Sequence, residues 1–212
     1  YYDATETKAN TLTPGSQEIV KQLKGGLTIT TYMNILDKNY GVALPSQLKH
    51  DFERFEQYMR FKPEIKMKYV YYYDTPSEPS YAGNFPELEG KERAEKICKT
   101  LNVDFNMFLS PEDIKKVTDS KGINLEEEGN RFVYLFEREN GQKAFLRIYD
   151  DNQRDPRESE ITAALKTMVV KSPQVAFITG HGERDIYKGG ERDYSAFAKN
   201  LTFRYSLINQ GF

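Results

Sequence analysis

Hydrophobic and polar residues alternate along this chain with two periods, and each change of period marks a new element. Alternation at every second position in Leu27–Met33 and Ile65–Tyr73 predicts two β-strands. The same pattern in Arg131–Glu139 and Gln142–Asp150 predicts two more. Asn140-Gly141 joins this second pair, and both residues tolerate the positive φ of a two-residue turn, so the sequence predicts a β-hairpin there.

Apolar residues recur every three or four positions between these strands, which predicts helices. In Pro45–Arg60 the expected buried stripe is Leu44, Leu48, Phe52, Phe55 and Met59. Proline follows a capping residue at three further helix starts, a pattern typical of first turns. The other predicted helices begin at Thr13-Pro14, span Glu87–Leu101, begin at Ser110-Pro111, and begin at Asp155-Pro156. Asp74–Phe85, with its prolines, glycine and asparagine, is predicted to be a loop.

The order of elements from the first strand is β-α-β-α-β-β-α. This order is typical of a thioredoxin-like α/β fold with a mixed sheet, and we expect it to occupy residues 1–172. Its first residues, Tyr1–Asn10, are polar and without periodicity, which indicates a lead-in segment.

A distinctive stretch follows at Gln174–Asp185. Val175–Ile178 is an apolar run rich in β-forming residues, and Gly180 and Gly182 then break it before a helical pattern at Asp193–Gln210. Residues 173–212 are therefore predicted to be the first β-α unit of a truncated Rossmann-like domain. Because one such unit cannot bury both faces of its strand, it should dock on the first domain, pair with another copy, or contact further polypeptide.

Composition limits the function classes. The 212 residues are 38% hydrophobic and 29% charged, and the formal net charge is −2, so no nucleic-acid partner is indicated. No apolar run approaches the roughly 18 residues of a membrane helix. Without an initiator Met or signal peptide, the sequence is expected to be a piece of a longer chain. The single cysteine, Cys98, excludes an internal disulfide and thiol redox chemistry of the CxxC type.

Polar side chains gather in the glycine turn, at the predicted carboxyl end of a strand, where ligands bind in open α/β sheets. The candidate binding residues are Thr179, His181, Glu183 and Arg184. His181 and Glu183 could form an acid–base or metal pair. A zinc site needs three or four ligands, however, and the only other histidine is His50, so no metal is expected. The favoured interpretation is architectural: the two side chains bond turn amides, and Gly180 and Gly182 shape the turn.

Other chemical signals are weak. The turn lacks the GxGxxG and GxxxxGK[ST] spacings of nucleotide sites, and the chain has no GxSxG nucleophile motif, so no cofactor is expected. Tyr69 and Tyr71–Tyr73 could form an aromatic platform for a glycan or peptide, although a half-buried strand is the favoured explanation. Glu126–Glu128 is interpreted as a solvated turn.

The segment TGHGERD, followed by RDYSAFAKNLTFRYSLINQGF, resembles the Gly-His-Gly-Glu segment of the ABC-transporter auxiliary family, which includes gliding-motility-associated GldG-like proteins. Asn10–Pro14, Leu27–Met33 and Glu160–Leu165 agree with the family in order. The resemblance implies a non-catalytic, extracytoplasmic domain of a membrane-tethered accessory subunit, located at the periplasmic face of the inner membrane. It also implies a structural role for Glu160 in holding the following turn.

The implied partners are the ABC-transporter permease and associated membrane subunits, with the membrane reached only through segments outside this chain. Two alternatives stay open. One is a hydrolase or amidotransferase-like site at His181 and Glu183. The other is a periplasmic domain that binds a small solute or glycan, which a concave aromatic pocket near Tyr69–Tyr73 would favour.

Overall fold

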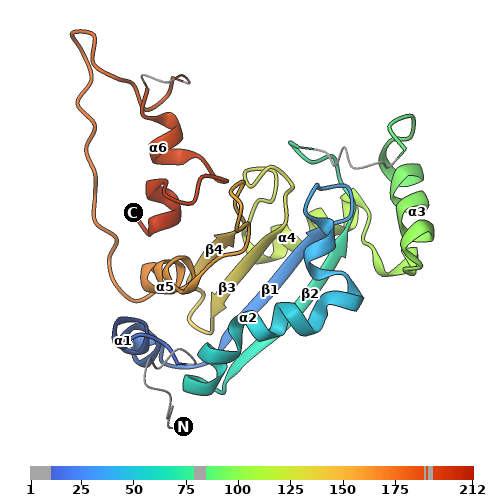
Figure 1. Ribbon diagram of the computed structural model, residues 1–212, viewed down its shortest axis with the longest axis horizontal. Helices are drawn as coiled ribbons and strands as arrows, with labels where there is room; N and C mark the ends of the chain where they lie inside the picture. The colour runs from blue at the N-terminus through green and yellow to red at the C-terminus, as the bar shows by residue number, and fades with distance from the viewer. Residues whose placement is uncertain (1–10, 79–84, 189, 191–192) are drawn as a thin grey trace. The chain divides into compact units, whose positions relative to one another are not determined.

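The computed structural model describes residues 11–78, 85–188, 190 and 193–212 (Figure 1). The predicted lead-in Tyr1–Asn10 and residues 79–84 of the predicted loop lie outside the described residues. Among the helices that are described, none combines the length and the apolar character needed to span a membrane.

Four strands form one sheet in the order β2-β1-β3-β4. The strands are β1 (Leu27–Asn34), β2 (Ile65–Tyr72), β3 (Val133–Arg138) and β4 (Lys143–Arg147). The Ile35 amide donates to the Tyr72 carbonyl at 3.0 Å, so β1 and β2 end side by side and are parallel. The Glu139 amide donates to the Gly26 carbonyl at 3.3 Å, so β3 runs antiparallel to β1. The predicted α/β class with a mixed sheet is confirmed; the thioredoxin-like description stays a prediction.

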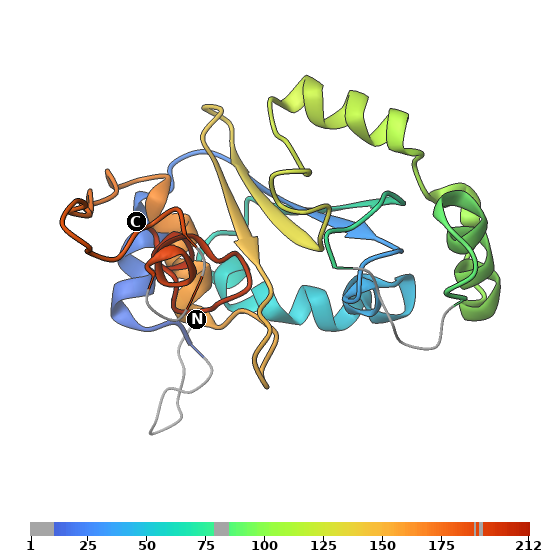
Figure 2. The same cartoon turned by 90° about the horizontal axis from the view of Figure 1, so that it is seen from above.

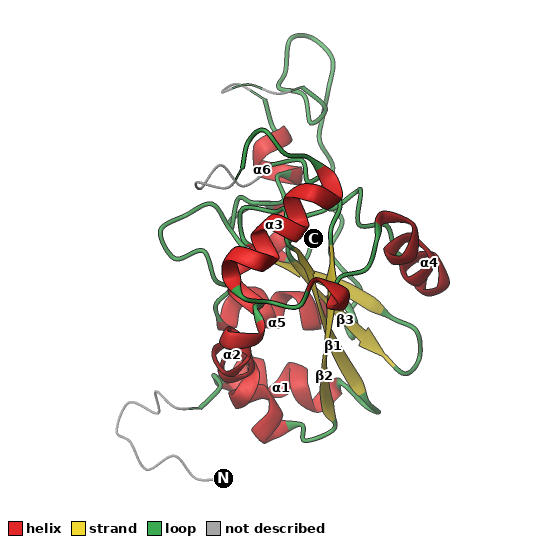
Figure 3. Cartoon of the chain, turned by 90° about the vertical axis from the view of Figure 1, so that its right-hand side faces the viewer, coloured by secondary structure: helices red, strands yellow, loops and turns green. Residues whose placement is uncertain are grey.

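Helices connect these strands. They are α1 (Pro14–Gln22), α2 (Leu48–Phe61), α3 (Gly90–Leu101), α4 (Pro111–Lys121), α5 (Glu158–Thr167) and α6 (Ser195–Lys199), with short 3₁₀ turns η1 (Tyr40–Ala43), η2 (Pro45–Gln47), η3 (Phe105–Met107) and η4 (Leu207–Gln210). Figures 2 and 3 show α2 and α4 on opposite faces of the sheet. The hairpin turn forms as predicted, with Gly141 at φ +85°.

The chain divides into two compact units. The first contains the residues up to Thr28, Gln57–Lys66 and Leu135–Phe212, and the second contains Ile29–Glu56 and Met67–Tyr134. Residues 173–212 thus belong to the same unit as β4 and α5. This division into compact units places no boundary at residue 172. The predicted domain boundary there stays a prediction.

In the first unit, α5 is the central helix. Glu158 on its first turn accepts hydrogen bonds from the amide and hydroxyl of Thr13, at 2.8 and 2.7 Å, and so holds the start of α1. Thr162, one turn on, bonds Ser16 at 2.8 Å and the Tyr58 hydroxyl at 2.8 Å. Thr13 also caps α1 as predicted, because its hydroxyl accepts from the Ser16 amide.

In the second unit, aromatic rings fill the core beneath α2. The ring of Phe55 meets that of Tyr134 edge-on at 5.2 Å, and Phe132 meets Tyr134 at 5.1 Å. The predicted stripe of α2 is partly wrong, because Phe52 is largely exposed whereas Asp51 is fully buried. The helix is rotated relative to the apolar pattern because Asp51 accepts hydrogen bonds from core hydroxyl groups. The interpretation of the tyrosine run as a strand is confirmed, since Tyr71, Tyr72 and Tyr73 are buried.

The start of α5 also differs from expectation. Asp155 and Pro156 were predicted to begin the helix, but it begins at Glu158 with Arg157 as its N-cap. The Arg157 amide donates to Glu160 Oε2 at 2.9 Å, which satisfies one of the free amides of the first turn. The Asp155 carbonyl, meanwhile, accepts from Arg204 at 3.1 Å.

The predicted strand at Val175–Ile178 is wrong: no strand forms in the described residues 173–188. Helical structure after Asp193 is limited to α6 and η4, not the continuous helix predicted to Gln210. A strand needs a neighbouring strand to take its backbone hydrogen bonds, and the sequence pattern alone does not supply one. Val175 and Ile178 are 46% and 81% exposed as a result.

The capping prediction at Ser110 is confirmed and testable. Its hydroxyl accepts from the Asp113 amide at 3.2 Å and bonds the Asp113 carboxylate at 2.9 Å. We expect Ser110→Ala to lower the free energy of unfolding by about 1 kcal/mol, because an amide of the first turn loses its partner. Ser120→Ala, in the last turn of the same helix, is the control and should change stability by less than about 0.5 kcal/mol. Urea unfolding followed by circular dichroism measures both.

Candidate functional site

The glycine turn that carries the predicted site is exposed to solvent. Gly180 and Gly182 have φ of +140° and +88°, values that disfavour any side chain. Thr179, His181, Glu183 and Arg184 are all exposed. Within the described residues neither His181 nor Glu183 makes a hydrogen bond, so the expected bonds to turn amides do not form. The two side chains share a short turn but are not brought together with other acids or bases.

The turn is instead held by Asp185 and Tyr194, to which the sequence interpretation gave no anchoring role. The Asp185 carbonyl accepts from the Tyr194 amide at 2.9 Å, and its carboxylate accepts from the Tyr187 amide at 2.8 Å. Tyr194 also packs its ring 5.3 Å from that of Phe177 and beneath the guanidinium of Arg184, at 5.7 Å. An aspartate bonding the amide two residues ahead is a common turn signal and could have indicated this anchor.

No group of three histidine, cysteine, aspartate or glutamate side chains in the described ranges is arranged to hold a metal ion. His50 lies on the exposed side of α2, 3.4 Å from Glu53. Cys98 is buried, and burial raises the pKa of its thiol to about 11. A thiol with this pKa is almost entirely protonated near neutral pH and is a poor nucleophile.

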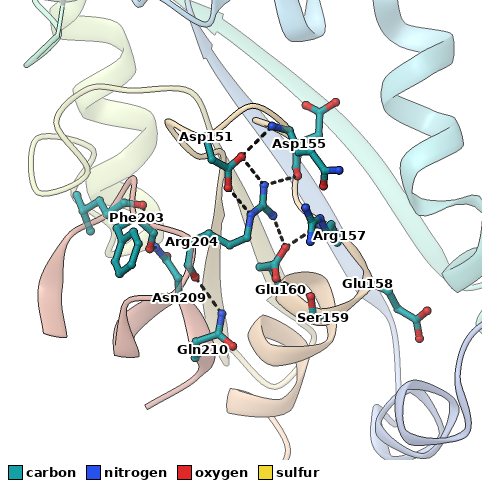
Figure 4. A network of polar contacts seen from close by, with 12 residues as sticks. Asp151, Asp155, Arg157, Glu158, Ser159, Glu160, Phe203, Arg204, Asn209 and Gln210 are labelled. Atoms are coloured by element: carbon teal, nitrogen blue, oxygen red, sulfur yellow. Dashed lines mark hydrogen bonds and ion pairs between the residues drawn. The ribbon is translucent and has the colours of Figure 1, made fainter. Parts of the chain in front are cut away.

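A polar network in the first unit is centred on Arg204 (Figure 4). Arg204 is 1% exposed although it lies only eight residues from the last residue, Phe212. Its guanidinium forms ion pairs with Glu160 and with Asp151, the latter at 2.6 Å, and donates to the Asp155 carbonyl at 3.1 Å. The same guanidinium lies 4.4 Å from the centre of the Tyr149 ring.

Two carboxylates therefore neutralise one buried cation. Hydrogen bonding to Asp151 raises the pKa of Arg204 above its usual range, with Glu160 adding to the shift, and Arg204 in turn lowers the pKa of Asp151. Glu160 is 3% exposed and also accepts from the Ser159 hydroxyl at 2.5 Å. The geometry gives Glu160 a structural position, but its partner is Arg204 in the last segment and not the turn that follows α5.

The burial of Arg204 fixes the directions of its two neighbours. Phe203 and Tyr205 project outward, 42% and 59% exposed, and their rings meet edge-on at 5.8 Å. Asn209 reinforces this arrangement, since its amide nitrogen donates to the Phe203 carbonyl at 2.9 Å while its oxygen accepts from Arg147 at 3.2 Å. The backbone of this exposed aromatic pair is thus held by hydrogen bonds, and we name Phe203 and Tyr205 the C-terminal aromatic surface.

The sequence pattern Phe203-Arg204-Tyr205 does not by itself predict that the arginine is buried and the two aromatic rings are exposed. A charged residue between two aromatics is equally typical of a solvated strand. The decisive fact is that acidic partners for Arg204 come from residues 44 and 53 positions earlier. Such long-range pairing has no local signature.

The second unit holds its own buried acids. Asp51 accepts from the Tyr134 hydroxyl at 2.5 Å and from Arg54 at 3.2 Å, and burial raises its pKa although these two partners oppose the rise. Asp37 follows β1, and its Oδ2 accepts from the amides of Asn39 and Phe132 at 3.1 and 3.2 Å. Burial raises its pKa as well. Both acids are enclosed in protein.

Comparison of the chain with protein-family models, with curated proteins and with solved structures finds no match. The family resemblance noted from the TGHGERD segment therefore stays a prediction.

Proposed function

We propose that this chain is a non-catalytic interaction domain and that it binds a partner protein through the C-terminal aromatic surface. The observation that carries the proposal is the distribution of exposed apolar side chains. Most of the large ones in the described chain lie after residue 174, in one unit. They are Val175, Ile178, Tyr187, Phe197, Phe203, Tyr205, Ile208 and Phe212. Aromatic residues held rigidly at a surface are typical centres of protein–protein interfaces.

The sequence resemblance suggests the larger protein and the cellular location in which this domain would bind its partner. The domain would belong to a membrane-tethered ABC-transporter accessory subunit on the extracytoplasmic face of the inner membrane, and its partners would be the permease and associated membrane subunits. The position of the aromatic surface within the segment that resembles the family supports this reading. No nucleic-acid partner and no cofactor is part of it.

The alternative of a hydrolase or amidotransferase-like site gains no specific support. Such a site needs a base that is oriented by a further side chain, and within the described residues His181 and Glu183 have no partner of this kind. The solute- or glycan-binding alternative depended on the tyrosine run, and Tyr71, Tyr72 and Tyr73 are buried in the second unit.

Truncation of the aromatic pair tests the proposal. We expect the double substitution Phe203→Ala and Tyr205→Ala to weaken co-purification with the permease complex at least tenfold, equivalent to about 1.4 kcal/mol, because the two rings would form the centre of the interface. Phe52→Ala, which removes an exposed ring from α2, is the matched control and should leave binding unchanged. Equal retention of the complex by all three proteins would contradict the assignment of this surface.

A further inference from the structure

The segment Gln174–Thr179 has the composition of a strand but no sheet. Apart from Phe177, its side chains are exposed, and Ile178 is the most exposed large apolar residue described, at 81%. Within the described chain its backbone makes no hydrogen bond. Backbone groups of this kind either stay hydrated or pair with another strand. Pairing is the more favourable state for an apolar run with β-branched residues, because it also buries their side chains.

The same unit offers a sheet edge with no described strand beside it. β4 is the last strand in the order β2-β1-β3-β4, so its outer edge faces no strand of the described chain. A cavity of about 260 Å³ lies along this edge, between β4, α5 and the last residues. Its lining combines apolar residues with polar ones: Phe145, Leu146, Ala164, Ile208 and Phe212, and Arg147, Glu160, Thr167, Ser172 and Asn209. The chain therefore leaves this cavity only two residues before Gln174.

Connectivity makes the two features complementary. β4, α5 and Gln174–Thr179 follow one another in the order of a β-α-β unit, in which the second strand lies parallel to the first on its open side. Six residues separate Thr167 at the end of α5 from Gln174, an ordinary length for such a connection. In this structure, however, the segment extends away from α5 toward α6 (Figure 1) and does not return to its own β4.

We propose that two copies of this chain form a dimer by exchanging Gln174–Thr179, each segment adding as a parallel strand to the β4 edge of the other copy. Ile178 packs beside Phe212 in this arrangement. Reciprocal exchange closes on itself with two-fold symmetry, so the assembly ends at two chains. The dimer buries Ile178 and Phe212, whereas the proposed partner binding uses the C-terminal aromatic surface, so substitutions at the two places test the two proposals separately.

Substitution at Ala176 tests the strand itself. Sedimentation velocity of the full chain across the micromolar to sub-millimolar range should show a concentration-dependent dimer. Ala176→Pro removes one backbone donor from the added strand and should weaken dimerisation at least tenfold. Ala176→Ser keeps the amide and is the matched control, expected to dimerise as the unsubstituted chain does. Ala176 is exposed, so all three proteins should share one circular dichroism spectrum. A monomer throughout the range, or equal dimerisation by all three, overturns the proposal.

Cross-linking identifies the residues that meet. An isotopically labelled chain with Ile178→Cys is mixed with an unlabelled chain carrying Phe212→Cys and then oxidised. The expected product is the disulfide between the two different chains, with little background from the buried Cys98. A dominant Ile178→Cys homodimer would show that two segments pair with each other, and a chain carrying both substitutions that cross-links only internally would show that the segment returns to its own β4. Either result overturns exchange.

Discussion

Arg204→Met should lower the free energy of unfolding of the first unit by about 3–5 kcal/mol, the usual effect of removing one partner from a buried ion pair. Glu160 would keep its burial but lose its cation, and Asp151 would lose its direct ion pair with that guanidinium. This contact joins the segment that carries α6 and η4 to α5, so we expect that segment to open first. Hydrogen exchange measured residue by residue should show the loss of protection concentrated after residue 194.

Two comparisons separate charge from packing. Lys199→Met removes an exposed cation from the same segment, one that lies over the Tyr187 ring at 4.1 Å, and should cost less than about 1 kcal/mol. Adding Glu160→Gln to Arg204→Met removes the orphaned charge and should restore part of the lost stability. If Arg204→Met behaves like Lys199→Met, the network is not a source of stability.

Asp51→Ala is the second large expected effect, a loss of about 3 kcal/mol in the second unit. The substitution removes the carboxylate that accepts from the Tyr134 hydroxyl and removes the ion pair between Asp51 and Arg54, which is mostly buried. Asp119→Ala on α4 is the control, since its ion pair with Lys115 spans 3.8 Å between exposed side chains and should contribute less than about 0.5 kcal/mol. Urea unfolding at pH 7 compares the two.

The raised pKa of Asp51 also predicts a pH dependence. Burial is the cause of the rise, so the folded protein binds this proton more tightly than the unfolded chain does. The stabilisation that this proton gives the folded state is therefore fully present below the ordinary aspartate pKa of about 4. It is lost as the pH rises through the higher pKa that Asp51 has in the folded protein. Asp51→Asn cannot ionise and should flatten the stability profile over this window; an unchanged slope would indicate that Asp51 is not the group responsible.

The parts of the fold that follow local rules could be predicted from the sequence. The Asn140-Gly141 turn, the Ser110 and Thr13 caps, and all four strands of the sheet depend on neighbouring residues or on short-range periodicity. The predicted burial of Phe52 was wrong, and the burial of Asp51 was not predicted, because helical periodicity assumes that apolar residues face the core. The Tyr134 hydroxyl instead donates a hydrogen bond to the Asp51 carboxylate, which favours its burial.

The candidate site was harder to predict for the same reason. The turn at His181 attracted attention because of its glycines and its histidine, but side-chain type alone does not bring a second reactive group near. Val175–Ile178 has strand composition and yet forms no strand, since pairing is a property of two segments. Arg204 looked like an ordinary surface cation in the sequence, and only its distant partners Asp151 and Glu160 reveal its burial.

The first turn of α5 carries two glutamates with different tasks. Glu158 accepts hydrogen bonds from Thr13 near the beginning of the described chain, and Glu160 forms an ion pair with Arg204 near its end. Tension applied at either extremity of the polypeptide is thus delivered to the same few residues of one helix. In a single-molecule pulling experiment, we expect the bonds made by this first turn of α5 to break before the hairpin strands β3 and β4 separate.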